Sequence, residues 1–281
     1  MNRRSVPLPV DNATVFDSNG VEGLWLGQGG FLFNVKGTFI LVDPYLSNYL
    51  EDNHGNLPYD HTRLIDPPIT EDLYPLIDLV VITHAHEDHL DPWFVQTFTT
   101  VNENAMFVIP AGCARDLKAL GVGEGRTHQM MSNGTFSDGN MISISAFGAA
   151  HPAIPTAADE EIRVLSYRFF FDGYTILFGG DTVLYPQWVQ WVHSKRNDLL
   201  ILPVNGRDPI KEANGIVGNM SFHEAVLLSQ YVKTPLLGTH FGMFAFNTVD
   251  KSTLADEISL FGLGDQVSLC ELGVIYSLIK E

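Results

Sequence analysis

The 281-residue chain is poor in cysteine, with only Cys113 and Cys270, which lie far apart in the sequence. Neither has a neighbour at the short spacing of cysteine-ligated zinc modules, so the sequence gives no sign of such a module. Two isolated cysteines are typical of buried thiols in a reducing compartment. The first residues include two arginines but no apolar segment of an export signal. We therefore expect a cytoplasmic protein.

Positive charge is also scarce, because 16 Lys and Arg stand against 33 Asp and Glu and the net charge is −17. Such a chain repels phosphate backbones, so no nucleic acid partner is expected, although a bound metal could still attract a small anionic substrate. No apolar run approaches the length of a membrane span, and no membrane partner is expected. The 45% hydrophobic content is enough for a large core, and a homo-oligomer stays open.

Short apolar runs between glycine-containing turns predict many strands, first in a meander and then alternating with helices. The expected strands are Leu24–Leu26, Phe31–Val35, Thr38–Val42, Ile77–Thr83, Phe107–Ile109, Met141–Phe147, a hairpin within Arg163–Asp181 that turns at Asp172 and Gly173, Leu199–Val204, Pro235–Gly238 and a closing run. Helices are expected after the Asp91–Pro92 cap, at Cys113–Leu120, at Pro186–His193, and after a capping box formed by Ser221 and Glu224.

Residues 44–75 show no periodicity and contain five prolines. Irregular connections of this length are usually functional or disordered, and we expect an active-site lid or an irregular insertion. His54 and His61 lie in this segment; contact with substrate is one alternative, but we expect them to be solvated loop residues. The motifs described next span residues 84–240 without a linker or repeat, so residues 1–281 are expected to form one domain.

The stretch "THAHEDHLDP" places His84, His86, Asp88 and His89 directly behind the expected strand Ile77–Thr83. Side chains at i and i+2 of extended backbone point the same way, and the other two lie in the loop that enters the next helix. Imidazole and carboxylate together suit Zn, Mn or Fe. The alternative is a solvated, histidine-rich loop, but this spacing behind an apolar strand favours a metal site, with two ligands for each of two ions.

Three more potential ligands, His151, Asp181 and His240, each come shortly after an expected strand. Any one of them alone would be interpreted as a turn residue or a satisfied polar group. Together with the upstream cluster they fit a complete shell for two metal ions.

The sequence contains H-x-H-x-D-H, a later His, "GGDT" and a last His, in this order. With this order of motifs, the sequence resembles the metallo-β-lactamase superfamily over nearly the whole chain. The resemblance implies an α/β fold, a four-layer αβ/βα sandwich with the metals at one edge between two sheets. It implies that Asp181 bridges two ions, of which one is held by His84, His86 and His151 and the other by Asp88, His89 and His240.

Within that superfamily, the chain is similar to the L-ascorbate-6-phosphate lactonase branch. The similarity lies in four stretches, "LWLGQGGFLF", "VDPYLSNY", "GGDTVLYPQW" and "PVNGRDPIKEANGIVGNMSFHEA". This similarity implies that Asn205 and Arg207 bind substrate. The chain departs from that branch in being shorter and in reading "VNGRD" where a longer loop is expected. From the residues alone, a guanidinium on a glycine-containing turn can bind phosphate or carboxylate in a fork, and the alternative is a surface ion pair of Arg207 with Asp208.

The resulting hypothesis is a metal-dependent hydrolase with two divalent ions, Mn or Zn, with Fe also possible. Water held between such ions ionises near neutral pH, and this hydroxide would attack a lactone or ester of a small phosphorylated sugar acid. Asp88 and Asp181 are the expected catalytic residues: Asp88 would also orient the nucleophile or return a proton to the leaving oxygen, and Asp181 would bridge the metals.

Two alternatives share the fold. The first is a phosphodiesterase, either nuclease-like or N-acyl-ethanolamine phospholipase D-like; a nuclease would need basic patches, and a lipid-cleaving enzyme an apolar docking surface. The second is an electron-transfer or non-catalytic member. The flavodiiron branch carries Glu where this chain has His86, and it needs a flavin domain for which the chain has no room.

Overall fold

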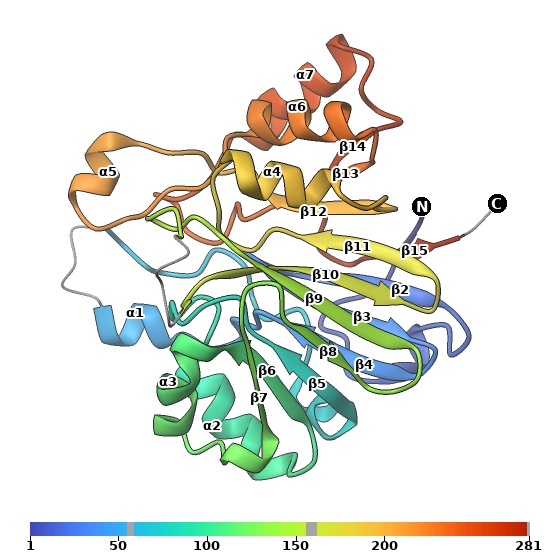
Figure 1. The fold of residues 1–281 in the computed structure, drawn as a ribbon, viewed down its shortest axis with the longest axis vertical. Helices are drawn as coiled ribbons and strands as arrows, with labels where there is room; N and C mark the ends of the chain where they lie inside the picture. Colours follow the sequence, from blue (N-terminus) through green and yellow to red (C-terminus); the bar gives the residue numbers. More distant parts are fainter. Residues whose placement is uncertain (55–58, 156–161, 280–281) are drawn as a thin grey trace.

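The computed structural model describes residues 1–54, 59–155 and 162–279, whose strands form two sheets packed face to face (Figure 1). The eight-stranded sheet runs in the order β1 (Asn2–Ser5), β15 (Val274–Leu278), β2 (Val21–Gly27), β3 (Gly30–Val35), β4 (Thr38–Val42), β5 (Ile77–Val81), β6 (Met106–Pro110) and β7 (Thr127–Met130). The seven-stranded sheet runs in the order β14 (Val267–Leu269), β13 (Leu236–Thr239), β12 (Leu199–Pro203), β11 (Tyr174–Phe178), β10 (Leu165–Phe171), β9 (Ile142–Gly148) and β8 (Thr135–Ser137).

Helices cover the outer faces of both sheets (Figure 1). Helices α2 (Pro92–Val101) and α3 (Ala114–Ala119) lie on the eight-stranded sheet, and α4 (Pro186–His193), α6 (Phe222–Val232) and α7 (Lys251–Leu260) lie on the other. Helices α1 (Tyr49–His54) and α5 (Pro209–Ala213) project from one end, and short turns of 3-10 helix occur at Ala13–Val15, Glu71–Leu76, Ala111–Cys113 and Glu124–Arg126. The four layers confirm the predicted αβ/βα sandwich.

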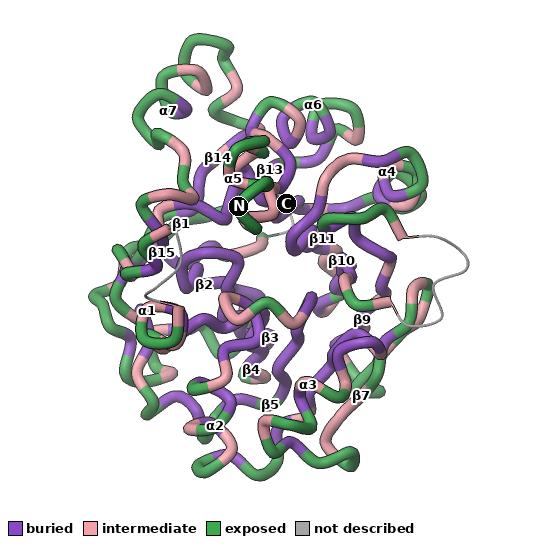
Figure 2. The backbone as a smooth tube through the Cα atoms, turned by 90° about the vertical axis from the view of Figure 1, so that its left-hand side faces the viewer, coloured by how far each residue is buried: buried purple, intermediate pink, exposed green. Residues whose placement is uncertain are grey.

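Two apolar layers hold the sheets and helices together, and the buried backbone runs along the strands (Figure 2). Between the sheets, the ring of Phe33 packs against those of Phe169 and Phe171 at centroid distances of 6.1 and 5.4 Å. Under α2, Phe98 packs against Phe107 of β6. Buried aromatic rings of this size dominate core energetics, because each removes roughly 150–250 Å² from water.

The strand directions place one edge of the molecule at the carboxyl ends of many strands. Strands β4, β5, β6 and β7 are mutually parallel, as are β11, β12, β13 and β14. Strand β9 is antiparallel to β10, which is antiparallel to β11, so β9 also ends at this edge. Residues that immediately follow these strands therefore gather at the same end of the sandwich.

The hairpin turn is confirmed at Asp172 and Gly173, which have φ angles of 46° and 91°. Such positive φ values at both central positions suit a tight turn between twisted strands. The expectation that residues 44–75 lack regular structure is wrong in part, because α1 and the 3-10 turn Glu71–Leu76 lie there. Both elements are six residues long, which is too short to produce a periodic sequence pattern.

Arg63 fixes part of this segment. Its guanidinium donates hydrogen bonds to the carbonyl oxygens of Tyr45 at 3.1 Å, Ser47 at 2.7 Å and Ile65 at 3.0 Å, and it lies 4.7 Å from the centre of the Tyr45 ring. Side-chain hydrogen bonds thus take the place of a sheet ladder here. Pro58, one of the five prolines of this segment, lies outside the described residues.

Candidate metal centre

The loop after β5 carries the histidine cluster, and the start of α2 holds this loop in place. The Asp91 carboxylate accepts hydrogen bonds from the backbone N–H groups of Trp93 and Phe94 at the helix N-terminus. It also accepts from the N–H groups of Leu46 and Ser47. Burial raises the pKa of Asp91, although these hydrogen bonds favour its ionised form. One side chain thus caps a helix and ties residues 46–47 beside the cluster.

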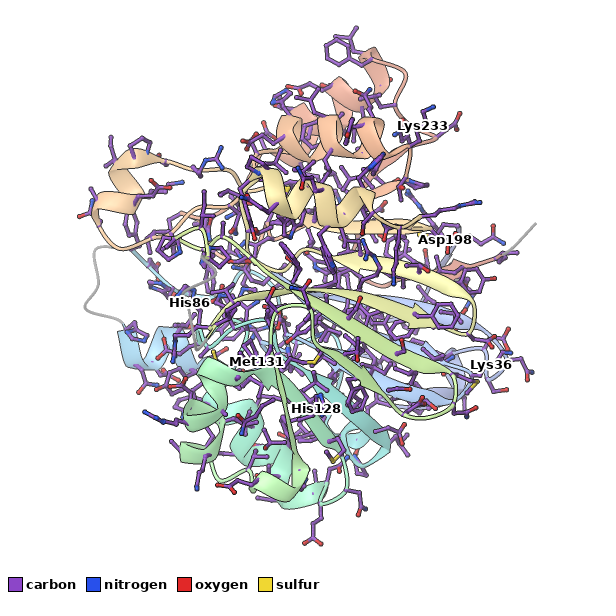
Figure 3. All side chains as sticks on the ribbon, viewed as in Figure 1. Lys36, His86, His128, Met131, Asp198 and Lys233 are labelled. Carbon is purple, nitrogen blue, oxygen red and sulfur yellow. The ribbon has the colours of Figure 1, made fainter. Side chains whose placement is uncertain are left out.

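The seven predicted ligands converge at the carboxyl edge, and Figure 3 shows His86 at the opposite end of the sandwich from Lys36 and Asp198. Three groups of side chains have potential ligand atoms within 4.8 Å of one another. They are His84, His86 and His151; His84, His89 and Asp181; and Asp88, His89 and His240. The first and third groups are the two ligand sets that the sequence resemblance implied.

Asp181 lies between these two sets. Its Oδ1 atom is 3.0 Å from His240 Nε2 and 3.4 Å from His89 Nε2, and its Oδ2 atom is 3.6 Å from His151 Nε2. The carboxylate therefore faces both ligand sets with different oxygens. This is the position that a bridging ligand would need.

Asp43 and Thr83, which the sequence reasoning missed, orient two of the histidines. Asp43 accepts hydrogen bonds from the Thr83 N–H, the Thr83 hydroxyl and His89 Nδ1, the last at 2.8 Å. Because the Thr83 hydroxyl donates to Asp43, its oxygen accepts from His84 Nδ1 at 3.0 Å. Both rings therefore carry their proton on Nδ1 and turn Nε2 towards the site. Asp43 follows β4 directly, so the rule that found the ligands, a polar residue behind a strand, could also have found it.

Gln28, also missed, orients the other set from the turn between β2 and β3. Its side-chain amide donates to Asp88 Oδ2 at 2.9 Å and lies 3.3 Å from His240 Nε2, while its carbonyl accepts the His240 N–H. Gly29 beside it allows close packing, since an added Cβ would lie 2.8 Å from the His89 ring. A glutamine between glycines gives no sequence signal for this role.

The electrostatics of the cluster follow from burial and from the two carboxylates. Burial holds the pKa of His84 well below its usual value and lowers the pKa of His151 to about 4, so both rings are neutral. Burial also acts on His89, but Asp181, Asp88 and Asp43 outweigh it and the net pKa is raised. For Asp181, burial is outweighed by His240 and His89, which lower its pKa. Neutral imidazoles and ionised carboxylates are the forms that bind metal, so His84, His151 and Asp181 are ready to bind, whereas a cation would have to displace a proton from His89.

The donor set fits a divalent cation. His84 Nε2 and His89 Nε2 are buried and have no hydrogen-bond partner among the described residues. An unsatisfied buried polar atom costs about 1–3 kcal/mol, so two such atoms aimed at one point need an explanation. Coordination to a cation accounts for both, and imidazole with carboxylate is a donor set for Zn, Mn or Fe.

Five of the seven predicted ligands line a cavity of about 370 Å³. His86, Asp88, His151, Asp181 and His240 form its polar part, and an apolar wall is formed by Leu50, Ile216, Val217, Phe244 and Phe246. His54 and His61 also line it. The expectation of a solvated loop histidine is therefore wrong for His61, which is 8% exposed, because Phe244 and Phe246 pack against its ring.

Asn205 and Arg207 are not among the described residues that line this cavity. Asn205 donates to Asn247 Oδ1 at 2.8 Å, and Asn247 does line it. The Arg207 guanidinium pairs with Glu224 on α6 at 2.6 Å. The alternative pairing of Arg207 with Asp208 is wrong, since Asp208 caps α5 instead. Substrate binding by Asn205 and Arg207 stays a prediction.

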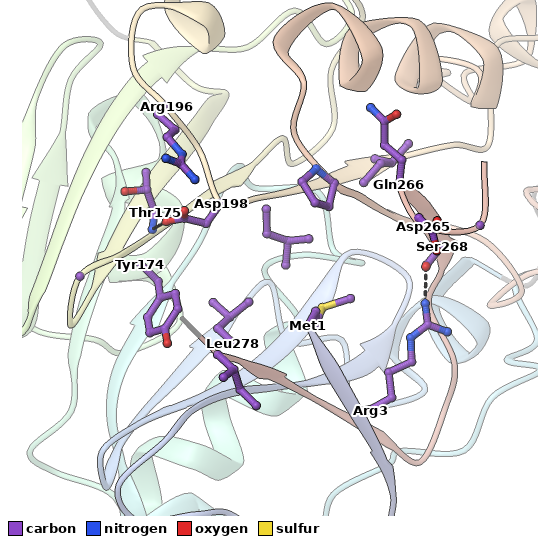
Figure 4. Close-up of a pocket in the computed structure, with 16 residues that line it drawn as sticks. Met1, Arg3, Tyr174, Thr175, Arg196, Asp198, Asp265, Gln266, Ser268 and Leu278 are labelled. Atoms are coloured by element: carbon purple, nitrogen blue, oxygen red, sulfur yellow. Dashed lines mark hydrogen bonds between the residues drawn. The ribbon is translucent and has the colours of Figure 1, made fainter. Parts of the chain in front are cut away.

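A larger cavity of about 1050 Å³ lies where Met1, Arg3, Asp198 and Gln266 meet (Figure 4). Arg3 there donates to the Ser268 hydroxyl, and Asp198 accepts from the Thr175 N–H at 2.8 Å. Among the residues that the structure describes, every group of side chains with metal-like spacing includes residues that line the smaller cavity, and none of these groups lines the larger one.

Comparison with known proteins agrees with this geometry. The family model described as "Beta-lactamase superfamily domain" matches residues 38–241, so the chain belongs to that superfamily. N-acyl-phosphatidylethanolamine-hydrolyzing phospholipase D 1 of Caenorhabditis elegans is 24% identical over 256 residues, which cover 86% of this chain and 70% of that protein. An uncharacterized protein of Mycobacterium tuberculosis, Rv0906, is 26% identical over 64% of this chain. The matched region covers about half (48%) of that protein's length.

Two solved structures have the same fold. A possible metal-dependent hydrolase from Veillonella parvula superposes with a TM-score of 0.75 at 15% identity, covering 92% of this chain and 100% of that one. Igni18, a metallo hydrolase from Ignicoccus hospitalis, superposes with a TM-score of 0.67 at 21% identity, covering 93% and 99%. The matched family and the His/Asp cluster together define the class, a metal-dependent hydrolase of the beta-lactamase superfamily.

Proposed function

We propose that the chain hydrolyses an ester-type bond, in a carboxylic ester, a lactone or a phosphodiester, with two divalent metal ions in the cavity at the carboxyl edge. The observation that carries this proposal is the convergence, from four separate segments, of seven His and Asp side chains, five of which line that cavity. His84, His86 and His151 would hold one ion, and Asp88, His89 and His240 the other, with Asp181 between them. When bound, divalent metal activates water near neutral pH and polarises the oxygen of the scissile bond.

The chain's own residues prepare this chemistry. Gln28 holds one oxygen of Asp88, so the other carboxylate oxygen can accept a proton from the nucleophile and pass it to the leaving oxygen. Asp43 and Thr83 keep His89 and His84 in one ring orientation, which avoids reorganisation during the reaction. The apolar wall excludes water from one side of the cavity.

The lining of the cavity favours a substrate with an apolar group and little negative charge. No Lys or Arg is among the described residues that line it, while Glu87, Asp88 and Asp181 are. A phosphodiester carries one negative charge, and the C. elegans relative is by its name a hydrolase of such a phospholipid. This favours the phosphodiesterase version of the proposal, whose substrate would lay an apolar group on Phe244 and Phe246.

The second candidate is the lactone of a small phosphorylated sugar acid. It is supported by the resemblance to the lactonase branch and by Arg207, which stands on a turn directly behind β12. Its phosphate would need a cation, so Arg207 would have to exchange Glu224 for substrate.

One assay separates these versions. Protein reconstituted with Mn or Zn is tested on bis-nitrophenyl phosphate, nitrophenyl butyrate and L-ascorbate 6-phosphate, with Asp181→Ala as the blank. Diester cleavage that is lost in the blank supports the phosphodiesterase, and ring opening of the lactone supports the second candidate. Equal activity of the Asp181→Ala variant would contradict the proposed centre.

A further inference from the structure

His61 lines the cavity of the proposed centre but is not one of its seven ligands. Two phenylalanine rings pack against its ring. The centroids of Phe246 and Phe244 lie 4.9 and 5.6 Å away, both with their planes inclined by about 65°. Tyr59 stacks on Phe246 at 5.0 Å and completes the group. A ring packed in this way has one orientation, as a specificity residue requires.

The hydrogen bond of His61 determines its tautomer. Nδ1 lies 2.9 Å from the carbonyl oxygen of Tyr59. A carbonyl only accepts, so Nδ1 must carry the proton. Nε2 has no hydrogen-bond partner among the described residues, and in the neutral ring it is an acceptor. The cavity thus contains one fixed acceptor next to an apolar wall.

We propose that His61 Nε2 accepts a hydrogen bond from an O–H or N–H group of the substrate, on the part that lies against Phe244 and Phe246. His61 therefore selects substrates that carry a hydrogen-bond donor beside an apolar group. This assignment rests on the proposed function, because it concerns the substrate of the same cavity.

A role as the proton donor to the leaving oxygen is less compatible with the surroundings. Such a donor needs a proton on Nε2, and so a doubly protonated ring. Burial lowers the pKa of His61, and nearby His54 lowers it further, although the Tyr59 carbonyl and Asp88 act in the other direction. The ring is therefore neutral near pH 7, and it acts on binding rather than on proton transfer.

The test compares nitrophenyl hydroxybutyl phosphate with its methoxybutyl counterpart, which lacks only the donor. We expect the wild type to prefer the hydroxyl substrate by about three- to tenfold in kcat/KM, mostly through KM, since the bond forms equally in ground and transition state. His61→Phe keeps the aromatic packing and should lose the preference. His61→Gln reaches the Nε2 position with its amide oxygen and should keep part of it. His128→Phe is the matched control, because His128 also packs against a phenylalanine ring, that of Phe136, but is not among the described residues that line the cavity; this variant should keep the preference.

The outcomes distinguish this inference from the proposed function. Cleavage of both substrates with equal kcat/KM by the wild type would overturn the role of His61 and leave the hydrolase intact. Cleavage of neither would count against the phosphodiesterase, and the nitrogen NMR spectrum of the His61 ring then decides the inference. It should show a protonated Nδ1 and a bare Nε2 at neutral pH, and a protonated Nε2 would overturn it.

Discussion

Asp43 shows how a residue outside the proposed ligand set can orient one within it. Its carboxylate lies 2.8 Å from His89 Nδ1, fixes the ring tautomer and raises the basicity of Nε2. Asp43→Asn keeps the size of the side chain but removes the charge. We expect the metal affinity of the purified protein to fall by about 10- to 100-fold, measured by competition with a coloured chelator.

Asp78→Asn is the matched control, because Asp78 also accepts a backbone N–H at a strand end but lies at the far end of β5. Its metal affinity should equal that of the wild type. An unchanged affinity in Asp43→Asn would show that the Thr83 and His84 contacts alone orient the site.

Among individual residues, the sequence predicts the potential metal ligands better than it predicts the side chains that orient them. His84, His86, Asp88 and His89 could be predicted because four metal-binding side chains follow one strand at close spacing. Gln28 and His61 could not, because each obtains its partner only when distant segments meet. Gln28 contacts Asp88 across 60 positions, and His61 packs on Phe246 from another loop.

Helix α6 begins with a capping box that also involves Arg207. Glu224 accepts the Ser221 N–H at 2.7 Å, and its other oxygen pairs with Arg207. Burial alone would raise the pKa of Glu224, but the hydrogen bonds from Ser221 and Arg207 outweigh it and the net pKa is lowered. A carboxyl group whose pKa is lowered on folding contributes stability above its unfolded pKa, and this contribution is lost as the pH falls through the folded value.

Glu224→Gln keeps the capping box and removes the charge. We expect the free energy of unfolding at pH 7 to fall by about 0.5–1 kcal/mol, because the partner Arg207 is partly exposed and its ion pair is screened. The difference from the wild type should shrink below about pH 4 in urea titrations. A difference that stays constant down to pH 3 would contradict an ionic contribution.

Elements with strong local signals were predicted, and weak edge elements were not. The β10–β11 hairpin has a turn at Asp172–Gly173 and apolar flanks, so its strands are clear from the sequence. Strand β1 is exposed at all four positions, and β8 has three residues, so neither shows the alternation of a half-buried strand. Their pairing with β15 and β9 comes from tertiary structure.

At the scale of the whole molecule, both cysteines belong to the core. Cys113 and Cys270 are fully buried free thiols. Burial raises the pKa of the Cys113 thiol to about 11 and that of Cys270 well above its usual value. Thiolate is the reactive form, so neither should react with a disulfide reagent at pH 8 in the folded protein. Both should react in denaturant; rapid reaction of one thiol in the native protein would reveal local opening near it.

The metal centre also connects the two sheets. The cluster from His84 to His89 follows β5 of one sheet, while His151, Asp181 and His240 follow β9, β11 and β13 of the other. An ion bound by ligands from both sheets opposes their separation, and the unfolded chain does not hold these ligands together. Zn or Mn at one hundred times its Kd should therefore stabilise the fold by about 2.7 kcal/mol. Tm should rise by roughly 5–10 °C, and a chelator should reverse the rise.

Two histidine variants test the cause of this stabilisation. His84→Ala removes a buried ligand and should lose most of the rise, whereas His223→Ala removes an exposed histidine that pairs with Glu257 outside the centre and should keep it. Amide exchange should slow at the ends of β5 and β13 together when metal is added, because the same ions hold both. Slowing in one sheet alone would mean that the ion is bound by ligands of that sheet only and does not link the two sheets.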